Sequence, residues 1–130
     1  MRRLLRSERG QTMVETAIVL PVVVLMLVAM VDAGRVFHSW IVVTNGAREG
    51  ARAGAARQAQ PIIIARIDSS MSGWTCDDPE ILCTTSGVLG ASGTPVQVTV
   101  SRDVDLLSPL ISQFWGGTVT LTGDATMQLE

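Results

Sequence analysis

The side chains that could carry catalytic chemistry are few and far apart in this sequence. His38 is the single histidine, and a lone imidazole is a poor general base without a partner to orient it. Cys76 and Cys83 are the two cysteines, and with one distant histidine they fall short of the four ligands of a structural zinc site. Because no nucleophile can be paired with a base, the sequence predicts no catalytic residue and no enzyme.

Binding motifs are equally weak. Asp77, Asp78 and Glu80 lie close together, but a solvated acidic loop explains such a cluster more simply than a metal ion does. The chain has no phosphate loop or dinucleotide fingerprint, and no basic stripe suited to nucleic acid. We therefore expect no cofactor, no metal, no nucleic acid and no small-molecule substrate.

A long apolar run near the N-terminus dominates the sequence instead. Residues 17–31, AIVLPVVVLMLVAMV, contain no charged side chain. A helix counted from Gln11 to the end of this run rises about 32 Å, which reaches across the ~30 Å hydrocarbon core of a bilayer. The sequence thus predicts a transmembrane helix over residues 11–34, with Glu15 near its inner end.

The charges on the two sides of this run differ in sign. Arginines at positions 2, 3, 6 and 9 precede the run, whereas most charged residues beyond Arg57 are acidic. Arginine-rich flanks of a membrane span stay in the cytoplasm. We therefore expect a single-pass protein of the bacterial cytoplasmic (inner) membrane, with residues 1–10 inside and residues 35–130 in the periplasm or at the cell surface.

A cleaved secretory signal peptide is the main alternative for this region. Cleavage after Ala33 or Gly34 would suit such a peptide. However, apolar or small residues continue beyond the run at spacings of three and four, at Val36, Trp40, Val43, Ala47, Ala51 and Ala55. This pattern favours a helix that leaves the membrane and continues as a soluble stalk to about Arg57.

The residues ahead of the apolar run carry a family resemblance. A short Arg-rich leader ends at Gly10, and Glu15 is the fifth residue after it. This spacing resembles the processing site of type IV pilins and pseudopilins, and the segment 9–21, RGQTMVETAIVLP, is similar to the start of TadE-like proteins. The segments 32–35, 45–52 and 117–127 are similar to the same family.

The resemblance implies a role in a pilus. It implies cleavage by a prepilin peptidase between Gly10 and Gln11, and an accessory part in assembling a tight-adherence (Flp, type IVb-like) pilus. The implied partners are the membrane, that peptidase, other pilin or pseudopilin subunits and the assembly machinery. A type II secretion minor pseudopilin, and a single-span binding or sensor domain that never enters a pilus, remain alternatives.

Glu15 has two interpretations within this scheme. An intramembrane carboxylate is costly unless it finds a partner, and the amine of Gln11 on a neighbouring subunit would supply one and set the register between helices. Alternatively, Glu15 reaches the headgroups beside Arg9. We expect the first.

The region after the span is predicted to be a small domain, so that the whole chain is α+β. We expect a pilin-like fold in which a long N-terminal helix, half transmembrane and half soluble, packs on a small antiparallel sheet. The expected elements are a helix over 35–57, a short helix over 62–71, a loop over 72–95, and strands over 96–104 and 117–128. The small residues of 46–56 suggest close approach of another element. Residues 106–115 form either core or an exposed contact patch, and core is favoured.

Cys76 and Cys83 are expected to form a disulfide. They are the only cysteines, and a compartment outside the cytoplasm is oxidising. The intervening segment includes Pro79 and can turn back easily. Two free thiols in a mobile loop are the alternative.

The predicted topology can be tested with reporter fusions. An alkaline phosphatase joined after Glu130 should be active, because that enzyme requires an external compartment to form its disulfides. A cytoplasmic reporter at the same position should be inactive. The reverse pattern would contradict the orientation inferred from the arginines.

Overall fold

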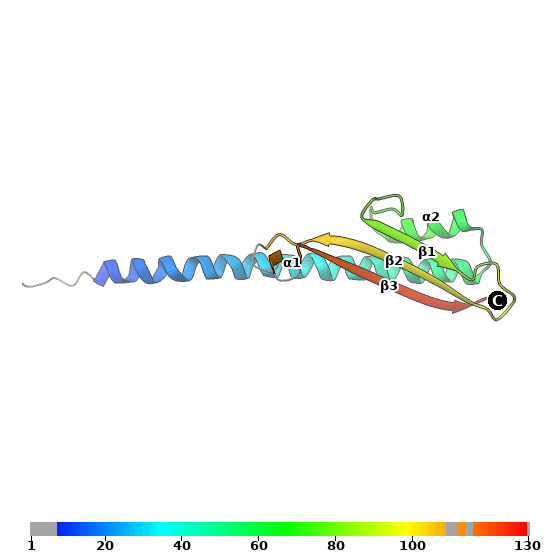
Figure 1. Cartoon of the computed structure of the whole chain (residues 1–130), viewed down its shortest axis with the longest axis horizontal. Helices are drawn as coiled ribbons and strands as arrows, with labels where there is room; N and C mark the ends of the chain where they lie inside the picture. The colour runs from blue at the N-terminus through cyan, green and yellow to red at the C-terminus, as the bar shows by residue number, and fades with distance from the viewer. Residues whose placement is uncertain (1–7, 109–111, 114–115, 130) are drawn as a thin grey trace, which may run out of the picture.

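A single helix, α1 (Glu8–Ala55), runs along the whole molecule, and every other element gathers around its C-terminal half (Figure 1). The computed structural model describes residues 8–108, 112–113 and 116–129. The other elements are α2 (Gln60–Ser70), β1 (Ile81–Ser86), β2 (Pro95–Asp105) and β3 (Thr118–Gln128). The α+β fold predicted from the sequence, a long N-terminal helix on a small antiparallel sheet, is confirmed.

The end of α1 is defined by its own backbone. Arg57 adopts a left-handed conformation with φ 54°. Its N–H donates to the carbonyl of Gly54 at 2.9 Å, and the N–H of Gln58 donates to the carbonyl of Ala53 at 3.2 Å. These two bonds form a Schellman motif, which satisfies carbonyls that the last turn would otherwise leave free. The helix therefore stops before the turn that leads into α2.

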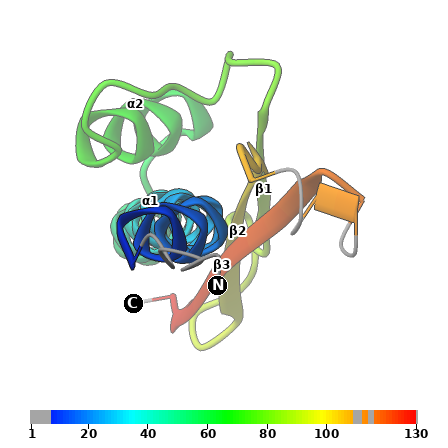
Figure 2. The same ribbon diagram turned by 90° about the vertical axis from the view of Figure 1, so that its left-hand side faces the viewer.

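The helix α2 packs on α1 beside the sheet, as the view along α1 shows (Figure 2). Pro61 lies in its first turn, where the missing N–H costs nothing and the fixed φ is favourable. Ile63 and Ile67 are fully buried, and so is Met71, which follows the last turn. Their spacing of four places all three on the face towards α1.

The sheet is antiparallel throughout, with the order β1-β2-β3. Val96, Val98 and Val100 of β2 are fully buried, as the alternation of apolar and polar residues in this strand predicts. Val100 pairs with Cys83 on one side and with Gly123 on the other. The central strand thus supplies most of the sheet's buried residues, while β1 and β3 form its edges and add Ile81 and the partly buried Cys83 and Ala125 to the core.

The prediction of a loop over 72–95 is wrong in one part, because β1 lies within it. Only Ile81 of this strand is buried, whereas Leu82 is 63% exposed. Burial alternates along β1, but its residue types, ILCTTS, do not alternate between apolar and polar, so periodicity could not detect the strand. Its extended conformation depends on pairing with β2, which begins at Ile81 opposite Arg102.

The apolar segment 106–115 is described only in part. Leu106 is half-buried, but Leu107 is 61% exposed, so the expectation that this segment belongs to the core is wrong for Leu107. Leu110, Ile111, Phe114 and Trp115, on which the expectation mainly rested, lie outside the described residues.

Glycines on one face of α1 allow three elements to meet. A Cβ added to Gly50 would lie 2.7 Å from Cγ1 of Ile67 in α2 and 3.0 Å from Cγ1 of Val98 in β2. Gly46 faces Met71, and Gly54 faces Val96. Because a side chain at these positions would occupy the space that the neighbours fill, both layers can approach the α1 backbone closely. This is the close approach that the small residues of 46–56 suggest.

The closest approach involves Gly123, where β3 crosses α1. A Cβ at Gly123 would lie 2.7 Å from the backbone N of Thr44 and 2.7 Å from the backbone C of Val43. These are main-chain atoms, which cannot rotate away as a side chain can. Only a glycine fits between the strand and the helix here.

Substitution of Gly123 should therefore lower stability. For Gly123→Ala we expect a loss of about 1–3 kcal/mol in the free energy of unfolding, since the methyl group must push strand and helix apart. Thermal unfolding in detergent micelles, followed by circular dichroism, would measure it. Gly34→Ala is the matched control, because a Cβ at Gly34 meets nothing within 4 Å. Equal melting of the two variants would contradict the close approach.

Candidate membrane anchor and assembly segment

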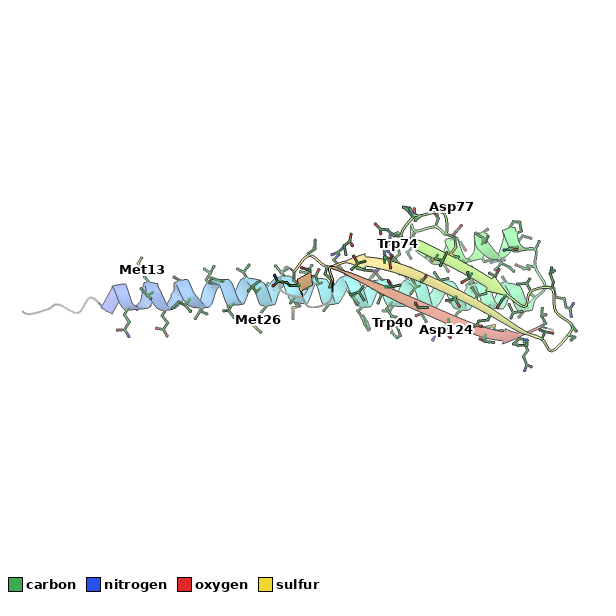
Figure 3. All side chains as sticks on the ribbon, in the orientation of Figure 1. Met13, Met26, Trp40, Trp74, Asp77 and Asp124 are labelled. Carbon is green, nitrogen blue, oxygen red and sulfur yellow. A yellow bond between two sulfur atoms is a disulfide. The ribbon has the colours of Figure 1, made fainter. Side chains whose placement is uncertain are left out.

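The N-terminal half of α1 is mostly apolar, and most of its side chains are exposed in the described structure. Most large apolar side chains from Met13 to Val31 are at least 48% exposed, with Met13 at 77% and Met30 at 74% among the most exposed, whereas Leu25 and Val28 are half-buried. Figure 3 shows side chains projecting from both sides of this segment. A helix that is apolar on all faces belongs in lipid or in a protein core. By length and composition α1 is able to cross a membrane once.

The predicted processing and assembly residues lie at the start of this helix. Gly10, Gln11 and Glu15 are all exposed and all helical. Gln11 and Glu15 are four residues apart and therefore share one face of α1. Among the side chains that the structure describes, none forms an ion pair with Glu15. Within the described part of the chain, the carboxylate therefore has no cationic partner.

Asp32 marks the point where the domain begins to pack on α1. Its side chain is 2% exposed, and both carboxylate oxygens accept backbone hydrogen bonds from the connection between β2 and β3. The N–H of Leu107 donates to Oδ1 at 3.0 Å, and the N–H of Ser108 donates to Oδ2 at 2.7 Å. Arg35 pairs with the same carboxylate at 3.4 Å. Hydrogen bonds of this kind are what a buried carboxylate needs to offset its lost hydration.

Sequence reasoning placed Asp32 in a family-like segment but missed this contact. A charged residue directly after an apolar run, with an arginine three residues later, was the available signal. That spacing suits an ion pair on the helix, and the structure contains such a pair between Arg35 and Asp32. The backbone partners, 75 and 76 residues away in the sequence, were not visible in the pattern.

A cluster around Arg102 holds the loop after α2 against the helix. The Arg102 guanidinium lies 3.3 Å from the centroid of the Trp74 ring and donates to Oγ of Ser39 at 3.3 Å. It also pairs with Glu80 at 3.7 Å. The ring of His38, the single histidine, meets the Trp74 ring in a T-shaped arrangement, with 5.9 Å between the ring centroids. His38 therefore packs against the loop. The contacts of Arg102 connect α1, β2 and the loop.

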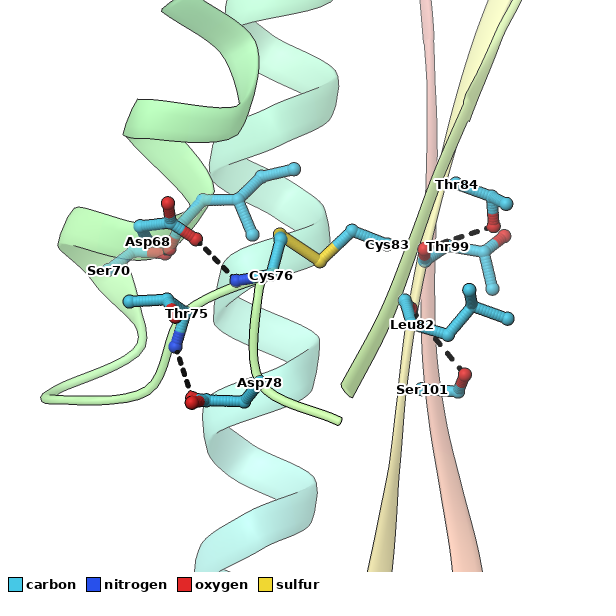
Figure 4. The surroundings of a disulfide bond; sticks show 11 residues. Asp68, Ser70, Thr75, Cys76, Asp78, Leu82, Cys83, Thr84, Thr99 and Ser101 are labelled. Atoms are coloured by element: carbon cyan, nitrogen blue, oxygen red, sulfur yellow. Dashed lines mark hydrogen bonds between the residues drawn. A yellow bond between two sulfur atoms is a disulfide. The ribbon is translucent and has the colours of Figure 1, made fainter. Parts of the chain in front are cut away.

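The disulfide lies in the same loop. Cys76 and Cys83 are bonded, with 5.6 Å between their Cα atoms, inside the range of about 4.4–6.8 Å usual for such bridges. The N–H of Cys76 donates to Asp68 of α2 at 2.8 Å, and the N–H of Thr75 donates to Asp78 at 2.8 Å (Figure 4). The bridge therefore joins the loop that follows α2 to the edge strand β1.

The predicted site residues form two separate groups. Gly10, Gln11 and Glu15 lie on the isolated half of α1, whereas Cys76 and Cys83 lie in the domain around its other half. Among the residues that the structure describes, no three His, Cys, Asp or Glu side chains gather as metal ligands would. The acidic residues at 77, 78 and 80 belong to the disulfide loop, where Asp78 is engaged by Thr75 and Glu80 by Arg102.

Residues 10–52 match the model of the TadE-like protein family. The resemblance inferred from the sequence is confirmed over that segment. The TadE-like segment lies wholly within α1: it begins at the proposed processing site, includes the apolar stretch and Asp32, and ends in the glycine-lined face. No curated protein and no solved structure matches the chain.

Loss of the disulfide should destabilise the domain without releasing it from the helix. In the chain-entropy model, closing so short a loop contributes about 2–3 kcal/mol. We expect Cys76→Ser with Cys83→Ser to lower the free energy of unfolding by about that amount, measured by denaturant titration in micelles. Reductant should have the same effect on the parent chain and none on the double variant. Full thiol labelling of native, unreduced protein would contradict the bridge.

Proposed function

We propose that the chain is a membrane-anchored, non-enzymatic minor pseudopilin that serves the assembly of a tight-adherence pilus. In this proposal a prepilin peptidase removes residues 1–10 at the cytoplasmic face, α1 spans the membrane over residues 11–34, and the remaining domain of residues 35–130 lies outside. The partners are that peptidase, other pilin or pseudopilin subunits and the assembly machinery.

One observation supports the proposal above all others. A glycine followed by a glutamate at the fifth position stands at the head of an exposed apolar helix, and the TadE-like match begins at that glycine. A secretory signal peptide would not require the glutamate, and it would not continue as a helix into the packed face of a domain. A soluble core helix would not leave its large apolar side chains exposed on every side.

The carboxylate of Glu15 is the chemical basis of the assembly step. A charged carboxylate within the membrane costs roughly 2.5–3.5 kcal/mol near the centre of a span, and less towards its ends. Cleavage after Gly10 would create a cationic amine on Gln11, one helical turn from Glu15. The pairing of Glu15 with the Gln11 amine of a neighbouring subunit would then favour one vertical register between the two helices.

The orientation follows from the charges and agrees with the chemistry of the domain. Arginine-rich leaders stay in the cytoplasm, which directs the domain outwards. A disulfide between Cys76 and Cys83 suits an external, oxidising compartment and would be kept reduced in a cytoplasm. Both arguments support the same side of the membrane for residues 35–130.

Processing can be tested directly at Gly10. Gly10→Val should block cleavage in cells that contain the peptidase, so that mass spectrometry finds a chain that still carries its leader. Gly34→Val is the matched control, because Gly34 is also an exposed glycine of α1 and should leave cleavage intact. A parent chain that still begins at Met1 in such cells would contradict the proposed processing.

Assembly can be tested separately at Glu15. Glu15→Gln should leave the protein cleaved and in the membrane, but it removes the charge that would pair with the Gln11 amine, so co-purification with other pilus subunits and pilus-dependent adherence should fall. Glu49→Gln is the control: Glu49 also lies on α1, but it pairs with Arg52 at 3.8 Å beyond the span. If the Glu15 variant adheres as well as the control, the register role is wrong.

A further inference from the structure

A small groove lies between α1 and α2 at the end of the domain that is distant from the apolar half of α1. Its volume is about 160 Å³, and it is lined by Glu49, Arg52, Ala53, Ala56, Gln58 and Arg66. Pockets that hold small molecules usually measure about 300–1,000 Å³. The groove is therefore too small for a typical metabolite, but it has room for a side chain of a partner.

The charges of the groove suit a carboxylate. Arg66 is exposed and forms no ion pair within the described part of the chain. Arg52 is 77% exposed, and its contact with Glu49 is loose, at 3.8 Å. Two guanidinium groups and one carboxylate leave the groove with a net positive charge. Because a planar guanidinium binds a carboxylate through two parallel hydrogen bonds, an incoming Asp or Glu is the side chain that these arginines favour.

Gln58 adds a second requirement. Its amide oxygen, Oε1, is buried and accepts no hydrogen bond from the described residues. A buried acceptor that lacks a donor is costly, because it has lost its hydration without compensation. The groove therefore favours an occupant that brings a hydroxyl donor as well as a carboxylate.

The outer face of β3 carries this combination. Thr122, Asp124 and Thr126 are exposed and alternate along the strand, so they stand in a row on one face of the sheet. Gly123 between them faces α1, and the row therefore points away from the helix. The two carboxylates of β2 on the same face accept hydrogen bonds from threonine hydroxyls, whereas Asp124 has no partner among the described residues.

The groove and this row lie on different sides of one molecule. Figure 2 shows α2 and the C-terminal end of β3 on opposite sides of α1. We infer that the groove of one copy receives segment 122–126 of a second copy, with Asp124 bound by Arg66 and Arg52. The inference deepens the proposed pilus role and rests on its single-span topology. Because two different faces meet, each copy keeps one of them for a further neighbour, and the contact can repeat along a series of copies.

The heights of the two faces along α1 determine how the copies are staggered. Gly123 meets α1 at Thr44, and β3 runs away from the apolar half of the helix (Figure 1). Asp124 therefore lies about 3 Å beyond the level of Thr44, whereas Arg52 lies about 12 Å beyond it. Within one chain the groove is thus about 9 Å further out than Asp124. A neighbour must be shifted outwards by this distance for its Asp124 to enter the groove.

The pairing proposed for the membrane requires a shift in the same direction. For the Gln11 amine of a neighbour to reach Glu15, that neighbour must move outwards by four residues of helix, or about 6 Å. The two shifts differ by less than the length of an arginine side chain. One neighbour can therefore make both contacts, one inside the membrane and one outside it. A constant stagger from copy to copy produces an open fibre rather than a closed ring.

The groove contact contributes register more than affinity. Exposed ion pairs are weak by themselves, because water and salt screen them. Both copies are anchored in one membrane, which raises their effective concentration. Complementary charges then select one arrangement of the domains over others. The contact should accordingly weaken at high salt.

Cross-linking in vesicles tests the contact without altering its charges. Full chains with Thr126→Cys are mixed with chains carrying Ala56→Cys in phosphatidylcholine vesicles and treated with a short bismaleimide; Cys76 and Cys83, joined as a disulfide, do not react. The proposed shift brings these two positions to one level. We expect several-fold more dimer than with Thr118→Cys, an exposed threonine of the same face about 26 Å nearer the apolar half of α1. Equal yields, or cross-linking of the Thr126→Cys chain with itself, would overturn the inference.

A charge exchange between the two chains tests the chemistry. Asp124→Arg in the Thr126→Cys chain should lower the yield several-fold, because it brings a third guanidinium to the groove. Arg66→Asp in the Ala56→Cys chain should restore the yield with that variant. Both positions are exposed, so neither change disturbs the core. A yield that Asp124→Arg leaves unchanged, or a loss that Arg66→Asp does not restore, would contradict the pairing.

The results also separate this inference from the proposed function. If the specific cross-link is absent while Glu15→Gln still lowers adherence, the pilus role stands and the groove contact is wrong. If the cross-link forms as expected while the parent chain is neither cleaved at Gly10 nor needed for adherence, the groove contact stands and the pilus role fails.

Discussion

The close approach of three elements to one helix face is the constraint on which the rest of the domain depends. α2, β2 and β3 all pack on the C-terminal half of α1, and at each contact one of the two elements contributes a glycine. Gly50 receives both Ile67 and Val98, while the backbone of α1 meets β3 at Gly123. Because those contacts are short, the valines and isoleucines of a small domain can bury themselves fully around a helix that contributes little bulk.

This packing makes the domain and the helix one mechanical unit. The soluble half of α1 is the central element of the core, with Val43, Ala47 and Ala51 fully buried, and the other half is exposed. A force or a shift in register applied to the membrane half is therefore transmitted directly to the domain, since no linker intervenes. Asp32 stands at the junction and holds the β2–β3 connection at one height along the helix.

The disulfide loop performs the corresponding task further along α1, near Ser39. It carries Trp74, which covers Arg102 of β2, and it ends at Cys83 in β1. β1 is an edge strand with little buried surface of its own, so the covalent bridge and the stacked guanidinium hold it where hydrophobic burial alone would be weak. The pilus role proposed for the chain requires such a rigid unit, because a register set in the membrane matters only if the external domain follows it.

The sequence by itself determined the features that repeat locally. The apolar run, the glycine-to-glutamate spacing and the alternating valines of β2 indicate an anchor, a TadE-like head and a strand, because each pattern reflects the geometry of its own segment. Only the tertiary structure decided the rest. The residue types of β1 do not alternate between apolar and polar, and the strand is extended because it pairs with β2. Asp32 and Gly123 meet backbone that is distant in the chain, and no local period records which distant segment will arrive at a given residue.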